Sequence, residues 1–186
     1  FDHMAILGDT LAQIAAEKAG IIKHGTALVL ESQEKEAMDV LNKAAERADI
    51  KTIKVVNLDE IRILPQKDGK QCFSYAGYDA VTMKMLGVHQ YENAVAAMLA
   101  AELFFEKYFA GKKNVPERKA LQHAIREGID RTQWMGRMEL VSNDPFFLMD
   151  GAHNSNGVEA LKKSLETMYP DEKFHFIMGV MADKDY

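Results

Sequence analysis

Five short stretches of the sequence concentrate side chains that can bind ions or polar ligands. They are Asp2-His3, Glu17-Lys18-Ala19-Gly20-Ile21, His89-Gln90-x-x-Asn93-Ala94, Gly136-Arg137 and Asp150-Gly151-Ala152-His153-Asn154. An amide offers both a donor and an acceptor, and a guanidinium forms a bidentate fork with phosphate. A carboxylate at the end of a strand lies where open α/β sheets place their ligands. These residue types are suited to a polar binding site.

Each stretch also has an ordinary structural explanation when it is taken alone. A His after an Asp is most often a hydrogen-bonded loop residue, and a Lys at position 18, just before a helix-ending Gly, is favoured by the helix dipole. Asn93, one turn into a helix, fits a capping role, and Arg137 fits a surface ion pair. Asp150 followed by Gly151 fits a common turn. The information therefore lies in the combination of motifs.

Several motifs of nucleotide, metal and redox sites are absent from the sequence. Gly69-Lys70 and Gly111-Lys112 lack both the following Ser or Thr and the preceding Gly of a phosphate-binding G-x-x-x-x-G-K-[ST] loop. The sequence also contains no G-x-G-x-x-G, H-E-x-x-H or C-x-x-C pattern. Any phosphate chemistry therefore lacks its backbone cradle within these 186 residues.

The composition argues against several classes of protein. With 47% hydrophobic and 27% charged residues, the chain is typical of a globular protein, and its single cysteine, Cys72, cannot form an internal disulfide. A net charge of −5 argues against a dedicated nucleic-acid binder. The longest run of small apolar residues, Ala94 to Ala101, is far shorter than the roughly 20 residues that cross a bilayer. The chain has no basic leader, so we expect a cytoplasmic domain with no membrane partner.

Hydrophobic periodicity predicts alternating helices and strands in the first 60 residues. Thr10 and Gln13 form a capping box for a helix that ends at Gly20. The elements expected next are a strand over 26–30, a helix over 34–48 with Ser32 as its N-cap, and a strand over 52–56. This β-α-β order implies a parallel sheet with a crossover helix.

The pattern changes after residue 60. Asp68-Gly69 is a tight-turn pair that predicts an antiparallel hairpin of strands over 61–64 and 71–75. The elements expected next are a strand over 80–85, an Ala-rich helix over 89–109, a helix from Pro116 to about 127, strands over 138–141 and 146–149, a helix over 156–168 and a strand over 174–178. We expect a domain boundary near Gly136, where a second strand-first α/β pattern begins.

Taken together and in order, the motifs resemble the folylpolyglutamate synthase/dihydrofolate synthase family. That family belongs to the Mur ligase superfamily of ATP-dependent amide-forming enzymes. The resemblance runs from Asp2-His3 to the closing G-V-M-A-D-K-D, effectively over the whole chain. Its most specific element is His3 followed fifteen residues later by Lys18 within E-K-A-G-I. This context is similar to the folate branch and not to the murein-peptide ligases.

The resemblance implies a magnesium site near the start of the chain. His3 matches the family's magnesium-ligating His, as a minority donor because Mg²⁺ prefers oxygen ligands. Lys18 matches the lysine that these enzymes carry as a carbamate, which supplies an anionic oxygen where an ammonium could not bind a cation. The resemblance implies a catalytic role for Lys18 and also for Arg137, which matches a phosphate-contacting residue of the family.

The resemblance also implies an ATP site. Asn93 matches the adenine-side Asn, Arg137 the phosphate-contacting Arg and Asp150 the acceptor of the ribose hydroxyls. His153 and Asn154 are expected to line the same cleft. The implied cofactors are ATP and Mg²⁺, and the implied substrates are L-glutamate and a folate or dihydropteroate.

The fold that the resemblance implies is α/β and has two parts. Residues 1–135 would be the later half of a Mur-ligase-type P-loop ATPase domain, without its phosphate-binding loop. Residues 136–186 would begin a Rossmann-like C-terminal ligase domain. The first residue, Phe1, and the end at Tyr186 suggest a piece of a longer chain, which we expect to be inactive alone and to self-associate.

Three functions are compatible with these features. The expected activity of the parent protein is ATP-dependent ligation of L-glutamate to a folate or dihydropteroate carboxylate through an acyl phosphate. A Mur-type ligase for another amino acid is the second possibility, which the E-K-A-G-I context disfavours. The third is a non-catalytic, truncated or degenerate Mur-ligase-like domain.

Overall fold

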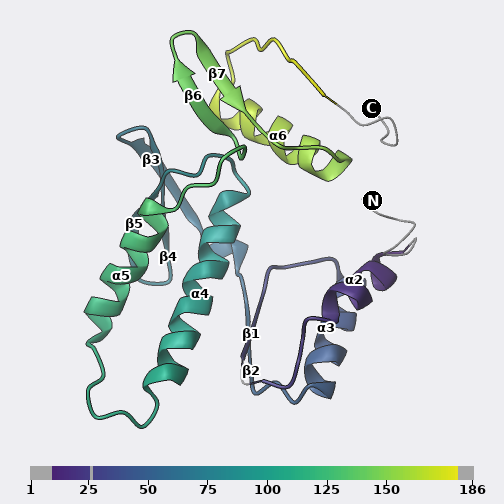
Figure 1. Ribbon diagram of the computed structural model, residues 1–186, viewed down its shortest axis with the longest axis vertical. Coiled ribbons are helices and arrows are strands. Elements are labelled where there is room, and N and C mark those ends of the chain that lie inside the picture. The colour runs from purple at the N-terminus through teal and green to yellow at the C-terminus, as the bar shows by residue number, and fades with distance from the viewer. Residues whose placement is uncertain (1–9, 26, 180–186) are drawn as a thin grey trace.

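The computed structural model describes residues 10–25 and 27–179, and within them the strands form three separate small sheets. Figure 1 shows helices packed around these sheets, with the long helix α4 (Gln90–Phe109) in the middle of the molecule. The expected α/β fold is confirmed. Within this described part, no helix has both the length and the apolar character needed to span a bilayer.

The first sheet is parallel, as its β-α-β order predicts. Strands β1 (Ala27–Leu30) and β2 (Thr52–Val55) pair in parallel and are joined by the crossover helix α3 (Lys35–Arg47). Helix α2 (Leu11–Ala19) packs against α3. A short 3₁₀ turn, η1 (Leu58–Glu60), leads away from this sheet.

Of the two helix N-caps predicted in this region, the structure has the one at Thr10 and lacks the one at Ser32. The capping box of α2 is confirmed, because Thr10 Oγ1 accepts from the Gln13 amide and Gln13 Oε1 accepts from the Thr10 amide. The expected N-cap at Ser32 is wrong. Helix α3 begins after Glu34, whose side chain makes no capping hydrogen bond. Ser32 lies too far upstream for its hydroxyl to reach the unpaired amides of the first turn.

The second sheet is antiparallel and has the order β3-β4-β5. Its strands are β3 (Arg62–Lys67), β4 (Lys70–Tyr75) and β5 (Tyr78–Met83). The expected hairpin turn at Asp68-Gly69 is confirmed, and both residues have positive φ, +53° and +71°. Such turns favour Asp-Gly because they need left-handed backbone.

The main hydrophobic core lies between this sheet and α4. Its buried members are Val56, Phe73, Tyr75, Tyr78, Val81, Met83, Tyr91, Ala94, Val95, Met98 and Ile125. The Phe73 and Tyr91 rings meet edge to face, with centroids 5.6 Å apart. Burial of these side chains fixes the N-terminal half of α4 on the sheet. Each large apolar side chain that is fully buried stabilises the fold by roughly 1.5–3 kcal/mol.

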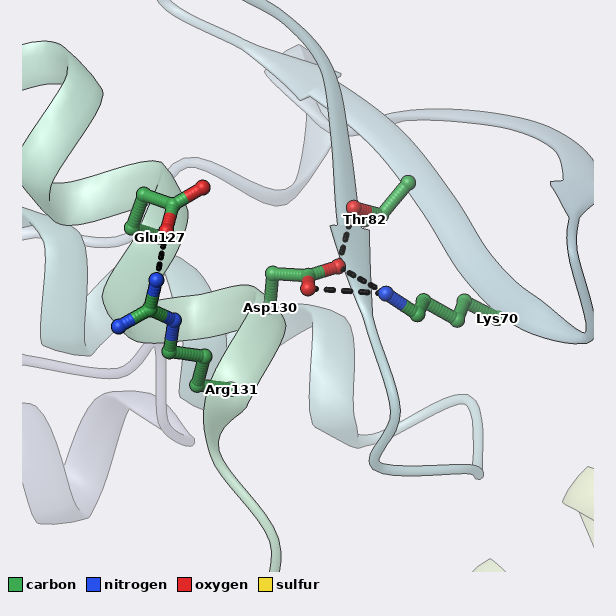
Figure 2. Close-up of polar contacts among 5 residues, drawn as sticks. All are labelled: Lys70, Thr82, Glu127, Asp130 and Arg131. Carbon is green, nitrogen blue, oxygen red and sulfur yellow. Dashed lines mark hydrogen bonds and ion pairs between the residues drawn. The ribbon is translucent and has the colours of Figure 1, made fainter.

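Helix α5 (Arg118–Arg131) packs on β5 and starts two residues later than the expected Pro116. A polar cluster fixes its last turn to the sheet (Figure 2). Asp130 accepts hydrogen bonds from Lys70 Nζ at 2.7 and 2.8 Å and from Thr82 Oγ1 at 2.6 Å. The connection that follows carries Trp134, which is largely exposed.

The last described segment is a hairpin covered by a helix. Strands β6 (Glu139–Asn143) and β7 (Phe146–Met149) are antiparallel, and α6 (Ser155–Met168) follows them. The strand expected over 174–178 is wrong, because the structure gives these residues no strand. Their alternating apolar pattern suits a strand, but no described strand pairs with them, and Ile177 is almost fully exposed.

Candidate functional site

A polar hollow of about 220 Å³ lies where the start of α4 meets α6 and the loops around the β6-β7 hairpin. Its lining residues are His89, Gln90, Asn93, Arg137, Asp150, Ala152, Gly157, Ala160 and Leu161. The hollow therefore combines one segment from the first half of the chain with three segments that follow residue 136. Motifs that are far apart in sequence converge here.

Three side chains at the start of α4 form a chain of hydrogen bonds. Asn93 Nδ2 donates to Gln90 Oε1 at 3.1 Å, and Gln90 Nε2 lies 3.0 Å from His89 Nε2. Because an amide nitrogen only donates, His89 Nε2 accepts, and a neutral ring carries its proton on Nδ1. This chain orients the Asn93 amide at the edge of the hollow.

His89 is held in its neutral form by its surroundings. Burial lowers the pKa of His89; the nearby Asp150 carboxylate opposes this effect and the Arg137 guanidinium reinforces it. Its Nδ1 atom is buried and has no hydrogen-bond partner among the described residues. The ring packs so closely on Gly87 that a Cβ added there would lie 2.8 Å from His89 Cε1. His89 is therefore a fixed, uncharged wall of the hollow.

Asp150 ties together the two loops that flank the hairpin. Its Oδ2 accepts from the Met138 amide at 2.8 Å, and its Oδ1 accepts from the Ala152 amide at 2.7 Å. Met138 has a positive φ of +41°, which is unfavourable for a residue with a long side chain. The carboxylate stabilises that conformation, and each of its oxygens keeps a second lone pair for a ligand hydroxyl.

Arg137 lies against the backbone of the D-G-A-H-N loop. The Gly151 amide donates to the Gly136 carbonyl at 2.8 Å. A Cβ added to Gly151 would lie 3.2 Å from that oxygen and 3.4 Å from Arg137 Nη1. Glycine at 151 therefore allows the two loops to approach closely, with the guanidinium beside the hollow.

The residues expected from the sequence do not all gather here. The structure brings Asn93, Arg137 and Asp150 together, but His153 is exposed and is not among the lining residues. The His153 Nδ1 donates to the Gly151 carbonyl at 2.9 Å. Lys18 is exposed in the last turn of α2, also outside the hollow. His3 lies outside the described residues.

Two polar side chains of the lining, His89 and Gln90, have no role predicted from the sequence. The signal was present, because both belong to the H-Q-x-x-N motif that identified Asn93. The burial of Gln90 and of the His89 Nδ1 atom, and the hydrogen bond between the two side chains, indicate a role in the wall and come from the structure.

A metal site is not assembled by the described residues. Within 10–25 and 27–179, no group of three or more His, Cys, Asp or Glu side chains could hold a metal ion. These residues do not fit a magnesium site by themselves, since Mg²⁺ needs several oxygen donors. The described part of the chain supplies a polar hollow and not the metal centre.

A second hollow, of about 260 Å³, lies along α6 among Leu165, Tyr169, Phe174 and Phe176. Its walls are mostly aliphatic and aromatic. A polar ligand such as a nucleotide needs converging donors and acceptors, so the hollow at His89 and Arg137 is the better candidate site.

Comparison with known proteins agrees with this architecture. A family model described as "Mur ligase, glutamate ligase domain" matches residues 136–186. The chain is 32% identical over 194 residues to the dihydrofolate synthase/folylpolyglutamate synthase of Bacillus subtilis (strain 168), covering all of this chain and 42% of that protein. The Mycobacterium tuberculosis folylpolyglutamate synthase complexed with ADP is similar with a TM-score of 0.70 and 30% identity, over 89% of this chain and 36% of that one.

A further solved structure, a folylpolyglutamate synthase complex with AMPPCP and folate, has a TM-score of 0.76 over 91% of this chain and 40% of that chain. Its identity of 23% shows likeness of fold. The architecture is thus that of part of a Mur ligase. More particularly, the resemblance to the folylpolyglutamate synthase/dihydrofolate synthase family is confirmed along the chain, which spans about two-fifths of the length of the relatives it matches.

Proposed function

We propose that the hollow between α4 and α6 binds the adenosine part of ATP. The observation that carries this proposal is the convergence of Asn93, Arg137 and Asp150, from three separate motifs, on one polar hollow. The M. tuberculosis relative was solved with ADP, which supports a nucleotide ligand. The hollow is smaller than the roughly 300–1,000 Å³ of typical small-molecule sites, so it would hold only part of a nucleotide.

Each side chain suits one part of that ligand. The Asn93 amide, oriented by Gln90, offers a donor and an acceptor to the adenine edge. Asp150 would accept from the ribose hydroxyls in addition to its two backbone amides. Arg137 would reach toward the phosphates with a bidentate fork. His153, which is exposed, would act at the rim.

We further propose a division of labour along the chain. Residues 1–135 would contribute an ATPase-domain part and residues 136–186 the start of the C-terminal ligase domain; the family match over 136–186 supports this boundary. The Mg²⁺ site would use His3 and a carbamate on Lys18, together with donors beyond those described. The bound ion would neutralise phosphate charge, and the chain's own residues would position the nucleotide.

For the whole protein, we propose ATP-dependent ligation of L-glutamate to a folate or dihydropteroate. The substrate carboxylate attacks the γ-phosphate, releasing ADP and forming an acyl phosphate. The glutamate amine then attacks the acyl carbon, and phosphate leaves as the amide forms. Relatives named as dihydrofolate synthase and folylpolyglutamate synthase support this reaction class.

The test is glutamate-dependent release of phosphate from ATP by the full-length protein, with a folate and with dihydropteroate as acceptors. We expect release with glutamate and little with other amino acids. Release that depends on a different amino acid would favour another Mur-type ligase. Absence of any amino-acid-dependent release from a folded, nucleotide-binding protein would favour a non-catalytic domain.

A further inference from the structure

The loop between β5 and α4, residues 84–89, ends at His89 in the wall of the candidate site and is held from two sides by buried polar side chains. On one side is Gln71 of β4, which is only 1% exposed. Its Nε2 donates to the Met85 carbonyl at 2.8 Å and to the Gly87 carbonyl at 3.1 Å. Both hydrogens of this amide are therefore used to fix the backbone just before His89.

On the other side is Ser164 of α6, which is completely buried. Its Oγ accepts from the Val88 amide at 3.0 Å and donates to the Ala160 carbonyl at 2.7 Å. Val88 and Ser164 are 76 positions apart. Leu86, from the same loop, and Leu165, next to Ser164, belong to one buried apolar cluster with Met138. The bond thus joins the loop before α4 to the helix after the hairpin.

The Ser164 hydroxyl connects two walls of the same hollow. Val88 precedes His89, and Ala160, which accepts from Ser164, lines the hollow together with Leu161. Packing alone would not select serine here, because alanine has a higher helix propensity and buries no polar atom. A serine at this buried position is explained by the Val88 amide, which would otherwise be left unpaired.

We propose that Ser164 and Gln71 are positioning residues, which set the separation between the His89 wall and the α6 wall and thereby the affinity of the hollow for an adenine nucleotide. The inference rests on the proposed nucleotide-binding function for its ligand. Neither residue lines the hollow, so both act through the loop backbone.

The chain offers a matched control for Ser164 on the same helix. Thr167 makes the same kind of hydrogen bond, from Oγ1 to the carbonyl four residues earlier, at 2.7 Å. Thr167 is exposed, whereas Ser164 is buried, and it lies almost one helical turn further along α6, where its hydroxyl donates to the Lys163 carbonyl. Thr167→Ala therefore removes a similar hydroxyl without touching Val88.

The experiment compares Ser164→Ala, Gln71→Leu and Thr167→Ala in the full-length protein. Amide hydrogen exchange at Val88 and the Kd for ADP are measured on the same samples. We expect about tenfold faster exchange and about tenfold weaker ADP binding in the first two variants, with neither change in Thr167→Ala. In turnover assays, KM for ATP should rise with kcat little changed.

The outcomes separate this inference from the proposed function. If the unsubstituted protein fails to bind ADP, the nucleotide proposal fails, whereas the exchange at Val88 still reports whether Ser164 holds the loop. Faster exchange of the Val88 amide in Ser164→Ala with unchanged ADP affinity would overturn the positioning role. The Val88–Ser164 hydrogen bond would then serve only the stability of the fold. Equal weakening by Ser164→Ala and Thr167→Ala would also overturn it.

Discussion

Lys70, the first residue of β4, reaches both carboxylate oxygens of Asp130, near the end of α5, at 2.7 and 2.8 Å (Figure 2). The two side chains are 29% and 27% exposed. Because the connection to Arg137 begins two residues after Asp130, this pair fixes the point from which the chain enters the candidate site.

We predict that Asp130→Asn lowers the free energy of unfolding by about 1–2 kcal/mol, because a partly buried charged hydrogen bond is lost. Lys70 and then Thr82, by hydrogen bonding, hold the pKa of Asp130 below its ordinary value of 3.8. The stabilisation is therefore fully present above the ordinary carboxyl range and is lost as pH falls through the lowered pKa. Urea unfolding at several pH values checks both statements.

The control for this prediction is Glu127→Gln in the same helix turn. It breaks the exposed Arg131–Glu127 pair (Figure 2), and exposed pairs contribute about 0–1 kcal/mol. If Glu127→Gln costs as much as Asp130→Asn, or if the cost of Asp130→Asn does not shrink in acid, the assignment of the stabilisation to the Lys70–Asp130 pair is wrong.

Gly87→Ala should disturb the wall of the hollow. Gly87 has a φ of +111°, and an added Cβ would lie 2.8 Å from His89 Cε1 and 3.2 Å from Met138 Sδ. We expect a destabilisation of about 1–3 kcal/mol and weaker ADP binding. Gly69→Ala, whose φ is +71° and whose Cβ would meet nothing within 4 Å, is the control: it should affect stability but not ADP affinity, as measured by calorimetry.

Arg137→Lys should keep the positive charge and lose the bidentate fork. In the full-length protein we expect roughly a tenfold or greater fall in kcat, comparable to removal of one transition-state donor. Steady-state phosphate release measures this. An unchanged kcat would mean that Arg137 has only a structural role, beside Gly151.

Substitutions of Lys18 can distinguish a carbamylated lysine that binds metal from an unmodified, positively charged lysine. As a partner of the α2 dipole it would contribute about 0.3–1 kcal/mol, and Lys18→Arg would be harmless. As a carbamate it is irreplaceable by Arg, so both Lys18→Arg and Lys18→Ala should abolish turnover. Added small carboxylic acids should partly restore Lys18→Ala. Full activity of Lys18→Arg in the full-length protein would refute the carbamate.

The β1-β2 sheet should promote self-association of the 186-residue chain. Ile53 and Val55 lie on one face of β2 and are 39% and 42% exposed. Exposed apolar strands favour edge-to-edge pairing. Light scattering should show species larger than a monomer, and the double variant Ile53→Lys, Val55→Lys should reduce them. A strictly monomeric chain at high concentration would contradict this expectation.

Local signals predicted local structure well. The Thr10–Gln13 capping box and the Asp68-Gly69 hairpin each depend on residues a few positions apart. The Val88–Ser164 and Lys70–Asp130 contacts join residues 76 and 60 positions apart, and no periodicity encodes them. The strand expected over 174–178 failed for the same reason, since a strand requires a partner that its own pattern cannot supply.

The candidate site was predictable only in part. Asn93, Arg137 and Asp150 were found through motifs, and the structure gathers them in one hollow. The backbone contacts of Asp150 and the buried, unpartnered Nδ1 of His89 depend on tertiary packing. The exposure of His153, likewise, follows from how its loop folds back on Gly151.

Trp134 is the only tryptophan of the sequence and is 71% exposed in the connection between α5 and β6. Indole emission from this protein therefore originates at one place, three residues before Arg137. The wavelength and the intensity of the indole emission depend on how much water surrounds the ring. The chain thus carries an intrinsic fluorophore beside the proposed boundary between residues 1–135 and 136–186, and a movement of one proposed part against the other would be visible without any attached dye.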